Sequence, residues 1–146
     1  MRVVIQVSGK ANCTVDYKPY SEIPKGLFVL VGFTEGDNEE KIKWMVNKIV
    51  NMRIFPKDDE DVGDISVKDI NGEILSISQF TLYADCTKGN RPGYTKALNP
   101  EEATVLYDKF NEELAKHVPV KTGVFGSHME ISFTNIGPHT IILEKW

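Results

Sequence analysis

The sequence has few cysteines, no surplus of positive charge and no long hydrophobic run, and each absence excludes a class of protein. Cys13 and Cys86 are the only cysteines in 146 residues. Two cysteines form neither the disulfide framework of a small secreted domain nor a set of zinc ligands. The formal net charge is -4, so we expect no general surface for binding polyanions. Contact with a nucleic acid would therefore need a local patch of cations.

The hydrophobic runs do not indicate a membrane segment, and the histidines do not indicate a metal site. No apolar run is long enough to span a bilayer, and the N-terminus lacks the apolar core of a signal peptide. We therefore expect a cytoplasmic protein without a membrane partner. The spacing of His117, His128 and His139 matches neither a metal site nor a catalytic triad. We predict no metal and no cofactor.

The pattern of apolar residues predicts a single α/β domain over residues 1–146. Helices are expected at residues 39–52 and from Asn99 to Pro119, because apolar residues recur there at helical spacing. Residues 35–38 offer an N-cap for the first helix, and its apolar face is expected to be Ile42, Met45, Val46, Ile49 and Val50. Asn99 is the expected N-cap of the second helix, followed by Pro100 and two acids. Strands are expected at residues 2–7, 12–16, 26–33, 73–77, 120–124, 129–134 and 140–143. The expected architecture is a mixed sheet or barrel-like set of strands with two principal helices.

Turn signals divide these elements. Gly9-Lys10 and residues 17–22 are expected to be turns, and residues 58–61 an acidic surface turn. Asn71-Gly72 is a strong signal for a β-hairpin before the strand at residues 73–77.

A polar stretch directly follows that apolar strand. Residues 78–82 read S-Q-F-T-L. A polar group that is buried without a partner costs roughly 1–3 kcal/mol. These groups are therefore either part of a strand end that turns into a loop, or they face a ligand. The pattern by itself leaves both interpretations open.

A second stretch, N-I-G-P at residues 135–138, lies between two apolar runs. Together the two stretches resemble the S-Q-x-T-L and N-x-G-P motifs of the D-aminoacyl-tRNA deacylase family. Further stretches that resemble the family follow in its order at residues 1–6, 25–27, 51–55, 88–92 and 121–126. The resemblance therefore covers nearly the whole chain.

The resemblance implies an ester hydrolase that removes a D-amino acid from the terminal adenosine of tRNA. It also implies hydrolysis of glycyl-tRNA mischarged on tRNA-Ala, and a homodimer whose active site lies at the interface. We expect no DNA partner. On this basis Ser78, Gln79, Phe80 and Thr81 are the expected catalytic residues.

The role of Thr81 has two interpretations. A threonine nucleophile needs a positioned base, and none is evident in the sequence. The alternative is a hydrogen-bond donor that holds the ester or stabilises an oxyanion. The resemblance supports the alternative, because the 2′-OH of the terminal adenosine can then help to activate water. Phe80 is either core packing or a contributor through its backbone.

Gly137 and Pro138 are the expected chirality filter. About 5–6% of X-Pro bonds are cis, so sequence statistics favour trans, whereas the resemblance implies cis. It also implies that carbonyl groups of this motif form a rigid wall in the partner's pocket. Such a wall accepts the hydrogen of a D-residue and clashes with an L side chain.

The remaining expected contacts also follow from the resemblance. Gln6, Phe125, Met129 and Asn135 are expected to bind substrate, with Phe125 and Met129 near the adenine; core packing is the alternative for these two. Three cations are candidates for contact with tRNA phosphates, although a solvated loop is the ordinary alternative: Lys88, Arg91 and Lys96.

Two positions depart from the family pattern. Val7 replaces an arginine that would hold the Gly-Pro motif, so Gln6 or backbone amides must hold it instead. Ile136 replaces an aspartate. These departures leave two alternatives open: a non-catalytic module that binds RNA ends, or a deacylase with relaxed chirality. A generic small-molecule hydrolase is a third interpretation, but the sequence lacks the base–nucleophile signature that such an enzyme would need.

Overall fold

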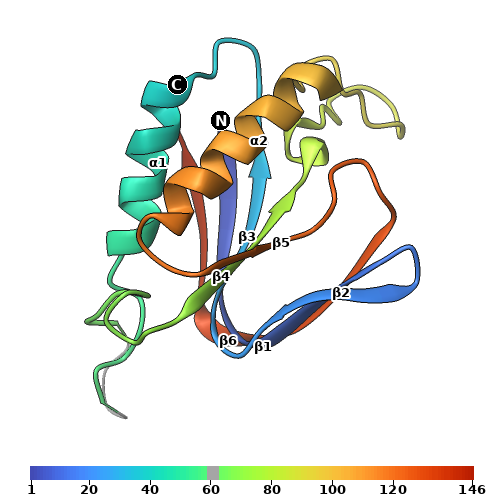
Figure 1. The fold of residues 1–146 in the computed structure, drawn as a ribbon. Helices are drawn as coiled ribbons and strands as arrows, with labels where there is room; N and C mark the ends of the chain where they lie inside the picture. The colour runs from blue at the N-terminus through green and yellow to red at the C-terminus, as the bar shows by residue number, and fades with distance from the viewer. Residues whose placement is uncertain (59–62) are drawn as a thin grey trace.

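β1 (Arg2–Val15) is the strand about which the sheet is built. The computed structural model describes residues 1–58 and 63–146. Along one edge, the first half of β1 pairs antiparallel with β3 (Gly26–Gly32), and its second half pairs with β2 (Lys18–Ile23). Along the other edge it pairs with β6 (Met129–Glu144). The sheet thus curls around β1 (Figure 1).

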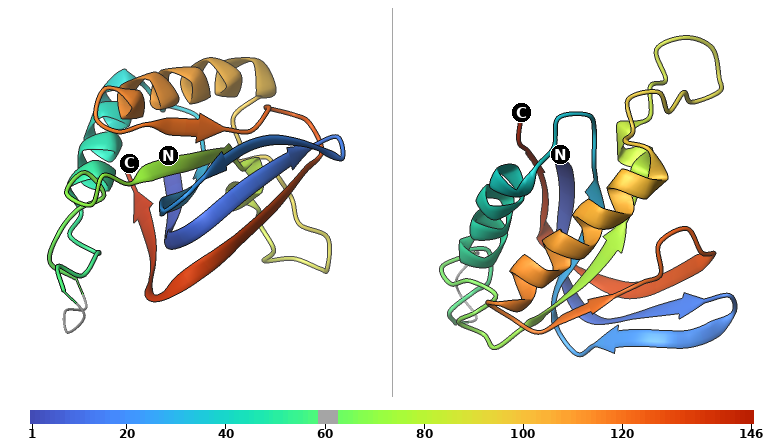
Figure 2. Two further views of the ribbon diagram at one scale, coloured as in Figure 1. Left: turned by 60° about the horizontal axis from the view of Figure 1, so that its bottom comes forward. Right: turned by 45° about the horizontal axis from the view of Figure 1, so that its top comes forward.

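β4 (Glu73–Ser78) and β5 (Val120–Thr122) extend the sheet beyond β3. Both run parallel to β3. The connections between these parallel strands contain α1 (Glu39–Asn51) and α2 (Pro100–Ala115). The two helices lie together over one face of the sheet (Figures 1 and 2). This arrangement confirms the predicted α/β fold with two principal helices and a barrel-like sheet.

The helices form where their caps and apolar stripes predict them. Asn38 accepts a hydrogen bond from the Lys41 amide at 3.0 Å, and Asn99 accepts one from the Glu102 amide at 3.0 Å. These side chains satisfy amides that the first turn leaves without partners. The buried stripe of α1 is the one expected from its spacing: Ile42, Met45, Val46, Ile49 and Val50. No helix in the described ranges has the length and apolar character to cross a membrane.

Two apolar cores stabilise the sheet. The larger one lies between the helices and the first half of β1, which contributes Val3, Ile5 and Val7. The smaller one fills the concave side of the sheet and is lined by Ala11, Cys13, Ile23, Phe28, Leu75 and Ile77. The first half of β6 covers this second core with Met129, Ile131 and Phe133.

Three turn predictions and one strand prediction were wrong. Gly9-Lys10 lies inside β1: Ser8 pairs with Asn135 and Ala11 with Phe133, so β1 carries an extra residue there as a β-bulge. Residues 17–22 form most of β2 rather than a turn. The strand after Asn71-Gly72 pairs parallel to β3, so the turn does not form a hairpin. The two strands predicted at residues 129–134 and 140–143 are one strand, β6. Residues 59–61 of the predicted acidic turn lie outside the described residues.

Candidate active site

A cavity of ≈ 680 Å³ lies where β3 and β4 end. Ligand sites in parallel sheets occur beyond the carboxyl ends of the strands, and this cavity occupies that position. Its lining brings together five residues that the sequence singled out: Ser78, Gln79, Phe80, Phe125 and Met129. Residues far apart in the sequence thus meet in one cavity.

The polar stretch after β4 forms a short 3₁₀ helix, η1 (Phe80–Tyr83). The Gln79 amide first donates to the Val31 carbonyl at 2.8 Å, which holds the end of β4 against β3. Gly32 makes this close approach possible. A Cβ atom at Gly32 would lie 2.9 Å from the Gln79 carbonyl oxygen and 3.2 Å from Cβ of Leu82. The absence of a side chain at Gly32 therefore sets the position of η1.

Thr81 is half-buried beside the cavity, although it is not one of the residues that line it. The Gln79 side-chain amide donates a hydrogen bond to its Oγ1. Because Oγ1 accepts this bond, the hydroxyl proton is available for donation to another group. Among the described residues, no side chain accepts a hydrogen bond from this hydroxyl. The geometry is that of a donor rather than of a nucleophile beside a base.

Exposed aromatic rings form one side of the cavity. Phe80 is 51% exposed, so core packing is the wrong interpretation of this residue. Its ring meets that of Tyr94 edge to face, with centroids 5.1 Å apart. Tyr94 comes from the loop after η1 and also lines the cavity. Together these rings offer an apolar surface to a ligand.

The loop between β5 and β6 closes the other side of the cavity with Phe125 and Met129. Gly123 is buried at its start, and a Cβ atom there would lie 2.3 Å from Sδ of Met129. The methionine sulfur thus occupies the space that a side chain at Gly123 would need. Met129 also packs against the inner core. The core-packing and cavity interpretations therefore both apply to Met129.

Gly137 and Pro138 do not line this cavity. Gln6 pairs with Thr140 and Ser8 with Asn135, so residues 136–139 have no partner on β1 and bulge out of the ladder. We call residues 136–139 the Gly-Pro bulge. Its Gly137-Pro138 peptide bond is cis, as the resemblance implied and against the statistical preference for trans. A Cβ atom at Gly137 would meet nothing within 4 Å.

Two side-chain hydrogen bonds flank the Gly-Pro bulge. Gln6 donates to the Thr140 hydroxyl at 3.1 Å, and Asn135 donates to the Val7 carbonyl at 3.3 Å. The Val7 side chain is 5% exposed and packs in the larger core. Residue 7 therefore contacts the bulge segment through its backbone. Gln6 and Asn135 lie at the base of the bulge, away from the cavity lining.

The family model for D-Tyr-tRNA(Tyr) deacylase matches residues 4–144. The chain belongs to this family. Members act on aminoacyl-tRNA, so the activity class is deacylase, a hydrolase of translation proofreading.

Two solved structures have the same fold. One is described as "c-Myc DNA Unwinding Element Binding Protein"; it is 37% identical, each chain is covered over 99% of its length, and the TM-score is 0.93. The other is described as "Structural Analysis of a probable eukaryotic D-amino acid tRNA deacylase". It is 17% identical, with 97% of this chain and 98% of that chain covered and a TM-score of 0.83. At that identity the likeness shows the fold alone.

The predicted phosphate contacts lie on the exposed loop after η1. This loop is closed by paired backbone bonds between Asp85 and Gly93, each 2.8 Å long. Hydrogen bonds from Thr87, with the nearby Lys96 cation, lower the pKa of Asp85. Lys96 Nζ lies 3.6 Å from that carboxylate, so its charge is partly balanced. In the part of the chain that the structure describes, Lys88 and Arg91 make no ion pair.

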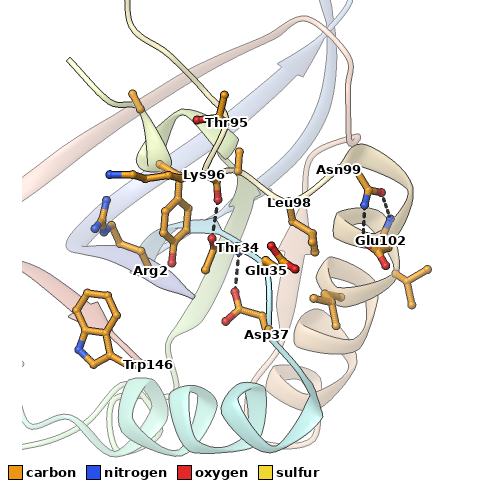
Figure 3. A pocket seen from close by; sticks show the side chains of 16 residues that line it. Arg2, Thr34, Glu35, Asp37, Thr95, Lys96, Leu98, Asn99, Glu102 and Trp146 are labelled. Atoms are coloured by element: carbon orange, nitrogen blue, oxygen red, sulfur yellow. Dashed lines mark hydrogen bonds between the residues drawn. The ribbon is translucent and has the colours of Figure 1, made fainter. Parts of the chain in front are cut away.

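A larger cavity of ≈ 1080 Å³ adjoins the first and shares Ala97, Leu98 and Asn99 with it (Figure 3). Its polar groups already bind one another. Arg2 donates to Glu144 and to the Leu82 carbonyl, and buried Asp37 accepts from the N-terminal amine and the Thr34 amide. Burial raises the pKa of Tyr83, which lies beneath Arg2, to about 12. These bonds fasten η1 and the chain termini, and none of the motif residues that line the smaller cavity lies here.

Sequence reasoning missed several cavity residues, among them Tyr94, Asn99, Ser127 and His128. An aromatic residue in a loop rich in Gly and Pro was a usable signal for Tyr94, whereas Asn99 was recognised only as a helix cap. Within the described residues, no cluster of three or more His, Cys, Asp or Glu side chains could hold a metal.

Proposed function

We propose that this deacylase hydrolyses D-aminoacyl-tRNA, and glycyl-tRNA mischarged on tRNA-Ala, in the cavity of ≈ 680 Å³. The observation that carries the proposal is the meeting of Ser78, Gln79 and Phe80 with Phe125 and Met129 in that cavity. Phe125 and Met129 offer apolar surface to the terminal adenine, and the end of β4 holds the ester. Lys88 and Arg91 extend outside the cavity, where they can contact tRNA phosphates.

Catalysis by this arrangement consists of positioning. The oxygen of a water molecule attacks the ester carbonyl carbon, and the 2′-OH of the adenosine helps to orient and deprotonate that water. The Thr81 hydroxyl, which accepts a hydrogen bond from Gln79, donates its proton toward the developing oxyanion. The bond from the carbonyl carbon to the 3′ oxygen then breaks, and the 3′ oxygen takes up the proton that the water lost, relayed through the 2′-OH, which accepts the proton of the water and passes on its own. The products are the free D-amino acid and tRNA.

Chirality is selected by exclusion in this proposal. The Gly-Pro bulge of one subunit reaches the cavity of the other, where its carbonyl oxygens face the Cα substituents of the substrate. Exchanging hydrogen and side chain at Cα places an L side chain against these oxygens. Glycine has no side chain and therefore passes. A displacement of about 1 Å is enough to weaken such a restraint, so Gln6 and Asn135 matter because they fix the base of the bulge.

A homodimer is part of this proposal. The Gly-Pro bulge does not line the cavity of its own subunit. Within the described ranges, β6 pairs only with β1, so its other edge is available to a second copy. Ile136 and Ile142 on β6 are exposed, at 49% and 64%, and burying them against a second subunit would remove apolar surface from water. Sedimentation velocity should give a dimer.

Subunit mixing tests the exchange of the Gly-Pro bulge. The double variant Gln6→Ala/Asn135→Ala loses both flanking hydrogen bonds and should gain hydrolysis of L-Tyr-tRNA. Mixed with excess Thr81→Val subunits, its cavities receive an intact bulge from a weakly active partner. L-Tyr-tRNA hydrolysis per double-variant subunit should then fall toward the wild-type level. An unchanged rate would mean that each bulge acts within its own subunit, which refutes the shared site.

A further inference from the structure

An aromatic pair lies on the rim of the cavity, outside the residues assigned to substrate so far. His128 lines the cavity, and the ring of Tyr17 lies over it with centroids 5.0 Å apart and planes inclined by 31°. Tyr17 is 76% exposed. Figures 1 and 2 show the end of the β1–β2 hairpin beside the segment that leads into β6. The pair therefore extends the cavity wall outward as an exposed aromatic surface.

The backbone holds Tyr17 there in an unusual conformation. Asp16 and Tyr17 form the turn between β1 and β2, with φ of 47° and 67°. Two-residue hairpin turns of this kind favour Asn-Gly or Asp-Gly, and a bulky residue at positive φ is an outlier. The Asp16 amide donates to the His128 carbonyl at 3.0 Å, which fixes the turn to the cavity rim. A strained position of this kind motivates a functional hypothesis for the residue that occupies it.

The charges around this pair fit a base better than a phosphate. Glu130 lies 3.8 Å from His128, and the carboxylate of Asp16 belongs to the same turn. Asp16 and Lys18 flank Tyr17 and offset each other, so Glu130 leaves a net negative charge that disfavours a phosphate, whereas a nucleobase is uncharged and offers a π-face. Single-stranded bases stack on exposed aromatic side chains, at roughly 1–3 kcal/mol per base.

We propose that Tyr17, supported by His128, is the platform on which the nucleobase preceding the terminal adenosine of tRNA stacks. The inference rests on the proposed function, which places the terminal adenosine in the cavity beside Phe125 and Met129. The preceding nucleotide must leave that cavity across its rim. The platform thus gives the enzyme a contact that distinguishes an RNA end from an isolated aminoacyl-adenosine.

The test compares D-Tyr-tRNA with D-tyrosyl-adenosine, which lacks the preceding nucleotide. Asparagine tolerates positive φ, so Tyr17→Asn removes the ring and keeps the turn. We expect kcat/KM for D-Tyr-tRNA to fall roughly 5- to 150-fold in Tyr17→Asn, the range that one stacked base implies. Hydrolysis of D-tyrosyl-adenosine should keep its wild-type rate. Tyr17→Phe should retain the wild-type rate on both substrates, as should the matched control Tyr20→Ala, whose ring is exposed elsewhere on the same hairpin.

Three results would overturn the proposal or its basis. Equal losses on both substrates would show a structural role for Tyr17, and no loss on D-Tyr-tRNA would show that nothing stacks there. Wild-type protein that hydrolyses neither substrate would refute the proposed function instead.

A binding measurement separates stacking from catalysis. Fluorescence anisotropy gives the affinity of a short RNA ending in C-C-A and of the same RNA with an abasic penultimate residue. The abasic residue should weaken binding to wild type and have no further effect in Tyr17→Asn. Equal effects in both proteins would refute the platform whatever the hydrolysis assay shows.

Discussion

Replacing Thr81 by valine removes a hydroxyl and keeps the shape of the side chain. The Gln79 amide donates to this hydroxyl, whose own proton is therefore available to the substrate. Loss of one such donor costs roughly 10²–10³ in kcat, equivalent to about 2.7–4 kcal/mol of transition-state stabilisation. We expect Thr81→Val to hydrolyse D-Tyr-tRNA more slowly by this factor, yet still faster than the uncatalysed reaction.

Stability has to be separated from catalysis in this experiment. The substitution leaves the half-buried Gln79 amide without its partner, which costs about 1 kcal/mol. For a chain of this size, about 1 kcal/mol lowers Tm by roughly 2–4 °C. A folded variant with a shift of this size is therefore suitable for kinetics.

Single-turnover deacylation at saturating enzyme gives the rate of the chemical step. Thr81→Ser retains the hydroxyl and should recover most of the rate. A folded Thr81→Val protein with no activity above background would make Thr81 the nucleophile and refute the donor role. An unchanged rate would show that the hydroxyl does not contact the reacting ester.

Three further outcomes follow from the same geometry. Gly32→Ala places Cβ 2.9 Å from the Gln79 carbonyl oxygen; overpacking of this kind costs about 1–3 kcal/mol, and it should also lower kcat because η1 must move. Denaturant unfolding with deacylation kinetics checks this, and a wild-type kcat would show that the position of η1 is unimportant. Gly123→Ala displaces the sulfur of Met129 and should raise KM more than it changes kcat; the reverse pattern in steady-state kinetics would remove Met129 from the binding wall. D-Tyr-tRNA ending in 2′-deoxyadenosine should bind but hardly react, and equal single-turnover rates for the ribo and deoxy substrates would exclude the 2′-OH.

The elements that the sequence predicted well are those that local patterns determine. The stripe Ile42 to Val50 and the caps Asn38 and Asn99 define the two helices, because periodicity and capping act within one element. The apolar run at residues 26–33 likewise predicted β3 in the middle of the sheet. These features do not depend on which strand lies next to which.

The wrong predictions concern features that strand pairing decides. Gly9 looks like a turn residue, yet pairing with β6 absorbs it as a bulge in a longer strand. Asn71-Gly72 turns the chain as expected, but its strand joins β3 because α1 has already crossed the sheet. Predicting these features requires knowing which strands pair, and the paired strands are distant in the sequence.

The candidate site divides in the same way. Residues 78–82 are contiguous, so their motif could be recognised without a structure. Tyr94 and His128 reach the cavity on loops whose approach is set by the sheet topology, and their patterns alone do not place them there. The hydrogen bond from Asn135 to the Val7 carbonyl was not predicted, because such a bond depends on which distant strands pair.

Chirality is the central claim, and it is tested most directly by the rates of D-Tyr-tRNA and L-Tyr-tRNA hydrolysis by the wild-type protein under identical conditions. Glycyl-tRNA serves as the substrate without a side chain. The account predicts that the D-substrate and glycyl-tRNA are deacylated and that L-Tyr-tRNA is spared. Hydrolysis of L-Tyr-tRNA as fast as D-Tyr-tRNA would contradict selection by the Gly-Pro bulge.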